Sequence, residues 1–316
     1  MTPHERLDAV ARFGFTTRQA GFLVTVMRHS GVCLPRQYAT FAGVAYGHKI
    51  NRFFERLVSR GFASACPCLH NRALVYHVYS RSLYGAIGEP HSRLRQPVPG
   101  AVVAPRLMLL DTVLEAPEVT WLAGEQDKVE HFTTRTGIPL DCLPQQAART
   151  GGAASCRLFP DALPIGVESP NRTLFVYSAT HSSLVDFRPF LRRHLALLSA
   201  LPVWTLRLVV APDDRAVETA WQVVIDREIG PLLAGPGHAE HRVEWWALGR
   251  RYGHVSPLVT DCSGVRRGVE QGEQVGERLA ARSQPPWSRS PGVPRRALGR
   301  SRMPGLRTNN YWPCVM

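Results

Sequence analysis

The sequence contains little lysine and no long hydrophobic run. Only Lys49 and Lys128 are lysines, so 36 of the 38 basic residues are arginine. The longest apolar stretch, residues 195–204, is interrupted by Ser199 and Pro202 and falls short of the roughly 18 residues that a membrane span needs. The first residues mix charges of both signs and lack the apolar segment of a secretory signal. We therefore expect a cytoplasmic protein without a membrane partner.

Motifs of several enzyme classes are missing as well. The sequence has no Gly-x-x-x-x-Gly-Lys-Ser/Thr loop and no Gly-x-Ser-x-Gly motif, which argues against P-loop nucleotide hydrolysis and against a serine hydrolase. The group Cys66, Cys68 and His70 has too few ligands and too close a spacing for a structural zinc site. The seven cysteines are irregularly spaced, which predicts reduced thiols when no export signal is present. We expect no cofactor.

Positive charge is unevenly distributed along the chain. The net charge of +13 divides into +9 for residues 1–100, −3 for residues 101–250 and +7 for residues 251–316. The two ends of the chain are basic and the middle is mildly acidic. This asymmetry indicates a polyanionic partner for one or both ends. Because a GC-rich coding sequence also enriches arginine over lysine, the total charge is weak support for nucleic-acid binding, and the positions of the charges must decide.

The spacing of apolar residues predicts three helices and a β-hairpin in the first domain, residues 1–97. The first helix begins at a capping box on Thr16, and a short second helix covers residues 36–41. A third helix covers residues 47–60, with apolar residues recurring at i, i+3, i+4, i+7 and i+8, the last being Val58. Two short extended segments within residues 62–79, joined by a polar turn, predict the hairpin.

This order of elements predicts a winged helix-turn-helix, whose third helix lies in the major groove of double-stranded DNA. Lys49, Arg52 and Arg56 share the outer face of that helix, where arginine suits guanine edges or phosphate, and Asn51 suits adenine. The predicted DNA-binding residues are Arg36, Gln37, Tyr38, His48, Lys49, Asn51, Arg52, Arg56, Arg60 and Arg72. The alternative interpretation is a winged-helix module that binds another protein through a solvated basic face.

The remaining chain is predicted to form a helical linker region (residues 98–143), a small α/β domain (144–248) and a tail (249–316). In the linker region we expect an irregular segment at 98–105 and helices at 106–114 and 121–132. In the α/β domain we expect a loop at 144–155 and strands alternating with helices thereafter. The tail is rich in Arg, Pro and Gly, so we expect it to be mostly disordered, and either to add non-specific DNA affinity or to be decayed coding sequence.

Three features resemble bacterial replication-relaxation type proteins of plasmids and integrative mobile elements. They are the winged-helix opening, the run Tyr-His-Val-Tyr-Ser-Arg-Ser-Leu-Tyr-Gly-Ala-Ile-Gly at 76–88, and Phe159-Pro160-Asp161-Ala162 before a strand–helix–strand segment. The resemblance covers about residues 10–230. It implies a role in replication, transfer or transcriptional control of a mobile element. It also implies association with the nucleoid or a plasmid, with replication or conjugation proteins as further partners.

The resemblance further implies an α+β protein whose second half is a restriction-endonuclease-like core. In such cores a Pro-Asp pair begins one strand and an acidic-x-Lys triplet lies on the next. Asp161 matches the first position, but the following strand at 174–179 has neither a carboxylate nor a lysine. Because metal-assisted phosphodiester cleavage needs carboxylates to hold the cation, we expect a degenerate core and no enzymatic activity. The alternative is a metal-dependent nuclease that uses Asp161.

Overall fold

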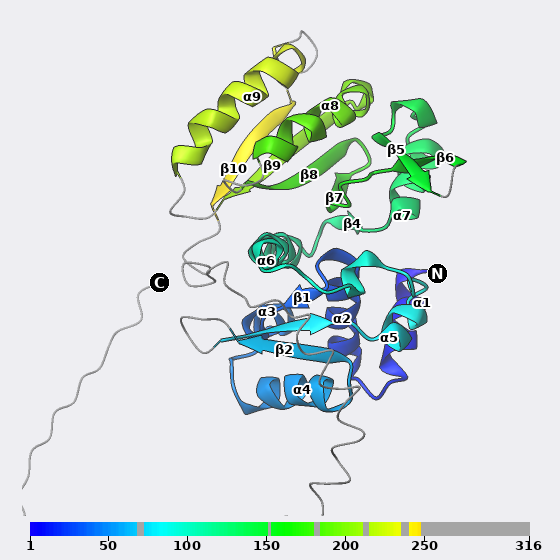
Figure 1. The fold of residues 1–316 in the computed structure, drawn as a ribbon, viewed down its shortest axis with the longest axis vertical. Helices are drawn as coiled ribbons and strands as arrows, with labels where there is room; N and C mark the ends of the chain where they lie inside the picture. The colour runs from blue at the N-terminus through cyan, green and yellow to red at the C-terminus, as the bar shows by residue number, and fades with distance from the viewer. Residues whose placement is uncertain (68–72, 151–152, 180–183, 211–214, 235–239, 248–316) are drawn as a thin grey trace, which may run out of the picture. The chain divides into compact units, whose positions relative to one another are not determined.

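The computed structural model describes residues 1–67, 73–150, 153–179, 184–210, 215–234 and 240–247. These residues form a mixed α+β structure with three β-sheets (Figure 1). Among them, no helix has the length and apolar character that crossing a membrane requires. The predicted tail, residues 249–316, lies outside the described residues.

The three predicted helices and the hairpin occur in the predicted order. The structure adds a helix before them and a short strand between the first two, and a further short helix follows the hairpin. The helices are α1 (Pro3–Ala11), α2 (Thr17–His29), α3 (Pro35–Ala42), α4 (His48–Ser59) and α5 (Arg81–Ala86). The strands β1 (Val32–Cys33), β2 (Ala63–Pro67) and β3 (Leu74–Val78) form an antiparallel sheet in the order β1-β3-β2. Capping boxes begin α1 at Thr2 and α2 at Thr16, because each threonine side chain accepts a hydrogen bond from a free N–H of the first turn.

Aromatic side chains hold α2, α3 and α4 together. The ring of Tyr38 on α3 lies 4.7 Å from the ring of Phe53 on α4 and 5.2 Å from the ring of Phe22 on α2, measured between centroids. Phe54 extends the cluster to the sheet, with its ring 4.4 Å from that of Tyr76. The two distances from Tyr38 are within the range in which aromatic pairs add stability beyond the burial of their area, and the Phe54–Tyr76 distance is at its lower limit. The cluster therefore fixes the position of α4.

The second half is built on a five-stranded sheet with the order β10-β9-β8-β7-β4. Its strands are β4 (Thr120–Leu122), β7 (Ile165–Ser169), β8 (Arg172–Ala179), β9 (Val203–Val210) and β10 (Arg242–Ala247). Strands β8, β9 and β10 are parallel, and they are connected by helices α8 (Leu184–Ala200) and α9 (Arg215–Leu233). Strand β7 pairs antiparallel with both β8 and β4. The strand–helix alternation predicted for this region is confirmed.

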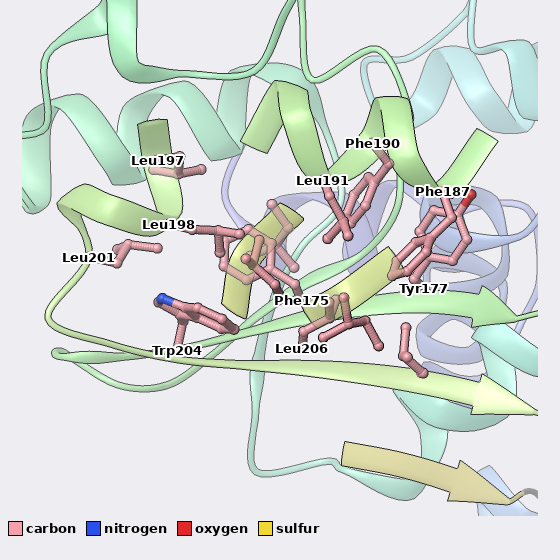
Figure 2. Packing of buried hydrophobic residues seen from close by; sticks show 14 of the residues in the cluster. Phe175, Tyr177, Phe187, Phe190, Leu191, Leu197, Leu198, Leu201, Trp204 and Leu206 are labelled. Atoms are coloured by element: carbon pink, nitrogen blue, oxygen red, sulfur yellow. The ribbon is translucent and has the colours of Figure 1, made fainter. Parts of the chain in front are cut away.

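Helices cover both faces of this sheet, which explains why β8 and β9 are apolar almost throughout. Phe175 and Tyr177 of β8 pack under α8, where the ring of Tyr177 lies 5.0 Å from that of Phe187 (Figure 2). The alternate residues Leu174 and Val176 belong to a different cluster, formed with helix α6 (Gly100–Glu115). Successive side chains of a strand point to opposite faces, so a strand covered on both sides needs apolar residues at every position.

Three predictions for residues 98–155 are wrong. Helix α6 begins at Gly100 and continues through Pro105, where an irregular segment was expected, because burial of Val103 and Leu107 outweighs the hydrogen bond that proline cannot make. The segment predicted as a helix at 121–132 begins as strand β4, followed by α7 (Glu125–Val129) and a π-helical turn, η2 (Glu130–Arg135). Short 3-10 helices occur at η1 (Arg93–Arg95) and η3 (Leu140–Cys142).

The third difference is the expected loop at 144–155. It forms an antiparallel two-stranded sheet of β5 (Gln145–Thr150) and β6 (Ala153–Leu158). Its small and polar residues lack the β-branched and aromatic enrichment from which a strand is normally predicted. Backbone pairing across the hairpin, rather than side-chain pattern, defines these strands.

Candidate nucleic-acid interface

Helix α4 presents one buried and one exposed face. Four of its apolar residues, Ile50, Phe53, Phe54 and Leu57, are buried in the N-terminal core, whereas Val58, expected in the same stripe, is 40% exposed. The opposite face carries exposed polar and charged side chains: His48, Lys49, Asn51, Arg52, Glu55 and Ser59. The buried stripe thus sets the orientation of the helix, and the sequence places donors and cations on its outer side.

The positive charge on this face lies near the positive N-terminal end of the helix dipole, where it is unfavourable. The first turn of α4 contains no acidic residue, while Lys49 lies in that turn, close to the positive end of the helix dipole. Within the described residues, neither Lys49 nor Arg52 forms an ion pair. A cation at a helix N-terminus is locally unfavourable, and local conflicts of this kind are concentrated at functional sites. The exposed face of α4 is therefore the candidate site.

Arg56 and Arg60 lie at the border of the face and are partly engaged within the protein. Arg56 Nη2 donates to Gln19 Oε1 at 2.6 Å, and its guanidinium carbon lies 5.1 Å from the centroid of the Phe15 ring. Arg60 Nη1 donates to the Phe13 carbonyl at 2.7 Å. Arg56 thus ties α4 to α2 and to Phe15 before it, Arg60 ties the end of α4 to Phe13, and each arginine retains N–H groups beyond those contacts.

The three residues of α3 that were predicted to contact DNA make contacts within the protein instead. Gln37 is fully buried: its Oε1 accepts from Leu34 N at 2.8 Å, and its Nε2 donates to Asp111 Oδ1 at 2.9 Å. Arg36 forms a two-point ion pair with Asp111. Tyr38 is buried in the aromatic cluster. The prediction of DNA contacts for Gln37 and Tyr38 is not compatible with their burial, and that for Arg36 is weakened by its pairing with a carboxylate.

Two acids from later in the chain, Asp111 and Asp127, compensate part of the positive charge of the first 100 residues. Arg28 pairs with Asp127 and lies 3.6 Å from Glu89, measured between Nε and Oε1. Arg6 Nη2 lies 3.7 Å from Asp127 Oδ1. The segmental excess of +9 therefore overstates the charge available to a polyanion, and the α4 face contributes a larger share of what remains.

One predicted residue lies outside the described residues, and one candidate was missed. Arg72, predicted at the tip of the hairpin, lies between β2 and β3 where the structure is not described. Tyr46, which directly precedes Gly47 at the start of α4, has 61% of its surface exposed. A tyrosine in the short segment between Gly43 and Gly47 is the sequence signal that could have identified it.

Asp161, the residue on which the nuclease interpretation depends, is engaged in an ion pair. Its Oδ1 accepts from Arg193 Nη2 at 2.5 Å. Among the described residues, no three His, Cys, Asp or Glu side chains come together as a possible metal site. Strand β8 brings no carboxylate or lysine to Asp161. The arrangement offers a salt bridge where metal-dependent cleavage would need at least a second carboxylate.

Lys128 nevertheless reaches the neighbourhood of Asp161, although it precedes it by 33 residues. It is 1% exposed, its Nζ donates to the Leu163 carbonyl at 2.6 Å, and both residues line one small cavity. Burial lowers the pKa of Lys128 to about 7, and the positive charge of Arg93 acts in the same direction. Sequence spacing alone could not place this lysine, because it comes from helix α7 rather than from the next strand.

The cysteines match the predicted thiols in part. Cys33, Cys142 and Cys156 are free, as expected. Cys66 is disulfide-bonded, which corrects the expectation of reduced thiols throughout. Cys68 and His70 lie outside the described residues.

Comparisons of the chain with known proteins found no matching family model, no matching curated protein and no matching solved structure. The assignment of a function therefore depends on the residues and their geometry.

Proposed function

We propose that residues 1–97 form a winged-helix domain that binds double-stranded DNA, with α4 as its major-groove helix. The order α2, β1, α3, α4, β2, β3 and the sheet order β1-β3-β2 support this proposal, because winged helices share this succession of helices and hairpin. The dimensions also fit: an α-helix is about 10–12 Å wide, and the major groove is about 12 Å wide.

The observation that carries the proposal is the exposed face of α4. Lys49, Asn51 and Arg52 project from a helix whose other side is fixed by four buried residues, so their positions are predefined before DNA arrives. Arginine and asparagine form the two-point contacts that distinguish guanine and adenine. Lysine acts as a point charge toward phosphate.

The proposal extends to the rest of the chain on sequence resemblance. The second half is proposed to be a degenerate restriction-endonuclease-like core, and the protein to act in replication, transfer or transcriptional control of a mobile element. The Phe159–Ala162 motif, followed by the β8–α8–β9 unit, supports the first statement. The ion pair of Asp161 with Arg193 favours binding over cleavage.

The proposal is tested by titrating the full chain into a fluorescently labelled random-sequence duplex. We expect Lys49→Gln and Arg52→Gln each to weaken binding to this duplex, because each removes a positive charge from the interface. Arg227→Gln is the matched control, because Arg227 is an exposed arginine on α9, away from α4. Equal affinities for all four proteins would exclude α4 as the interface. Absence of any DNA affinity would favour the winged-helix module that binds a protein.

A further inference from the structure

A cavity of about 500 Å³ lies between α6, η1 and α8 and plays no part in the proposed DNA interface. Its walls carry three arginines: Arg93 on η1, Arg106 on α6 and Arg193 on α8. Cavities of about 300–1,000 Å³ are typical of sites for small molecules. The size and the lining together identify a candidate ligand site.

The positive charge of this cavity is only partly neutralised. Arg193 pairs with Asp161, and Asp186 is the second acid in the lining. Arg93 Nη2 donates to the Pro160 carbonyl at 3.2 Å, and Arg106 Nη1 donates to the Ser30 carbonyl at 3.4 Å. In the part of the chain that the structure describes, neither Arg93 nor Arg106 pairs with a carboxylate.

Burial and neighbouring positive charge make the charged state of these arginines less favourable than in water. Partial burial, followed by the charges of Arg157 and Arg106, lowers the pKa of Arg93. Burial likewise lowers the pKa of Arg106. These arginines remain charged at neutral pH, so the free energy of their desolvation and repulsion is stored in the ligand-free protein. A bound anion would offset it.

His29 provides an independent observation at the same cavity. Its Nδ1 is buried and has no hydrogen-bond partner among the described residues, although His29 belongs to the lining. Burial, together with the charges of Arg28 and Lys128, lowers the pKa of His29 to about 3. The imidazole is therefore neutral at physiological pH. Buried polar atoms in native proteins are normally hydrogen-bonded, so an unpartnered one beside a cavity indicates a group that completes the site.

We propose that this cavity binds a small phosphorylated molecule, with its phosphate between Arg93 and Arg106. Arginine presents a rigid fork of donors that matches the oxygens of a phosphate. Val102 and Leu109 of α6 provide an apolar wall for the rest of the ligand. Duplex DNA carries its phosphates on the outside of a wide cylinder, which cannot enter a cavity of this size. The ligand of the cavity therefore differs from the DNA of the proposed function.

The test uses the full chain and three anionic probes: inorganic phosphate, pyrophosphate and adenosine monophosphate. Adenosine serves as the uncharged control. At constant ionic strength, we expect millimolar adenosine monophosphate to raise the melting temperature, because a ligand that binds only the folded state stabilises it. Isothermal titration calorimetry then gives the affinity, and we expect Arg93→Gln and Arg106→Gln each to weaken it about tenfold or more, with Arg227→Gln unchanged.

Three results would overturn the proposal. They are the absence of a shift with all three anions, an equal response to adenosine, and affinities in both cavity variants that equal that of the original chain. If Arg106→Gln lowers the melting temperature without ligand, Arg93→Gln decides, because Arg93 is more exposed. DNA affinity is measured separately on the same variants, so failure of this proposal is distinguishable from failure of the proposed DNA binding.

Discussion

Arg36 of helix α3 and Asp111 of helix α6 form a two-point ion pair, with Nη2 to Oδ2 at 2.9 Å and Nη1 to Oδ1 at 3.2 Å. Gln37 donates to the same carboxylate and also to the Leu107 carbonyl at 3.0 Å. Asp111 is buried, and three donated hydrogen bonds therefore compensate its charge. Two residues predicted to contact DNA instead hold α6 against α3.

Removing this carboxylate should destabilise the fold. Asp111→Ala leaves Arg36 and the buried amide of Gln37 without their acceptor. We expect a loss of about 2–3 kcal/mol in the free energy of unfolding, measured by urea titration. Arg36→Gln should cost at least as much, because it leaves the buried carboxylate of Asp111 without its counter-charge. Equal stability of Asp111→Ala and the original chain would show that the ion pair contributes nothing.

Substitutions on α4 should separate base recognition from phosphate contact. If Asn51 and Arg52 contact bases, Asn51→Ala and Arg52→Ala each cost about 1–3 kcal/mol on a preferred site and relax its sequence. Lys49→Gln should instead weaken all sequences alike. Selection from a random duplex library, followed by affinity measurements on the selected and scrambled sites, checks both. Identical selected sequences for all variants would contradict base contact by α4.

Acidification should destabilise the protein through His194. This side chain is buried under Phe159, Phe175 and Phe190, and burial lowers its pKa from 6.5 to about 4. Nearby Asp161 opposes this shift, whereas Lys128 and Arg193 add to it. During acidification, His194 therefore takes up its proton at a lower pH in the folded protein than in the unfolded chain. Stability is fully present above pH 6.5, and about 3 kcal/mol is lost as pH falls to about 4.

Urea unfolding at several pH values measures this effect. About half of the expected loss falls between pH 6.5 and 5, where few carboxylates titrate. His194→Gln should reduce the slope in that interval, and His29 and His131, whose pKa values burial also lowers, contribute to what remains. A stability that stays flat from pH 7 to 5 would show that His194 is not buried as a neutral ring.

Two glycines with similar backbone angles should differ in their tolerance of alanine. Gly31 and Gly43 have φ of +74° and +61°, so alanine costs about 1–2 kcal/mol at either position. At Gly31 a Cβ would also lie 2.4 Å from the Leu94 carbonyl oxygen, whereas at Gly43 it would meet no atom within 4 Å. We expect Gly31→Ala to lose a further ~1–3 kcal/mol. Equal melting temperatures for the two variants would contradict the close approach of Leu94.

The sequence predicted correctly those elements in which the spacing of apolar residues matches the positions that are buried in the structure. Helix α4 is an example, because its apolar spacing and its buried residues coincide at every position except Val58. The same is true of strands β8 and β9, whose apolar runs reflect cover on both faces. The start of helix α6 and the β5–β6 hairpin were missed because a proline and a run of small polar residues suggested irregular structure, whereas the helix predicted at 106–114 is confirmed as part of α6. In both cases tertiary packing or backbone pairing outweighed local preference.

The site could be predicted only in part, for a related reason. Spacing correctly placed Lys49, Asn51 and Arg52 on an exposed face. It could not show that Gln37 faces inward, because its partner Asp111 lies 74 residues away in sequence. The approach of Lys128 to Asp161 and the cavity between α6 and α8 likewise join distant segments, and no one-dimensional pattern encodes them.

The salt dependence of DNA affinity tests the proposed function most directly. Fluorescence anisotropy of the full chain on a random duplex, at several salt concentrations, gives the slope of log affinity against log salt. For DNA bound through α4, we expect about −0.9 per phosphate neutralised, and a slope that becomes shallower by about 1 in Lys49→Gln. A slope near zero would contradict binding through this helix. So would a slope that changes neither in Lys49→Gln nor in Arg52→Gln.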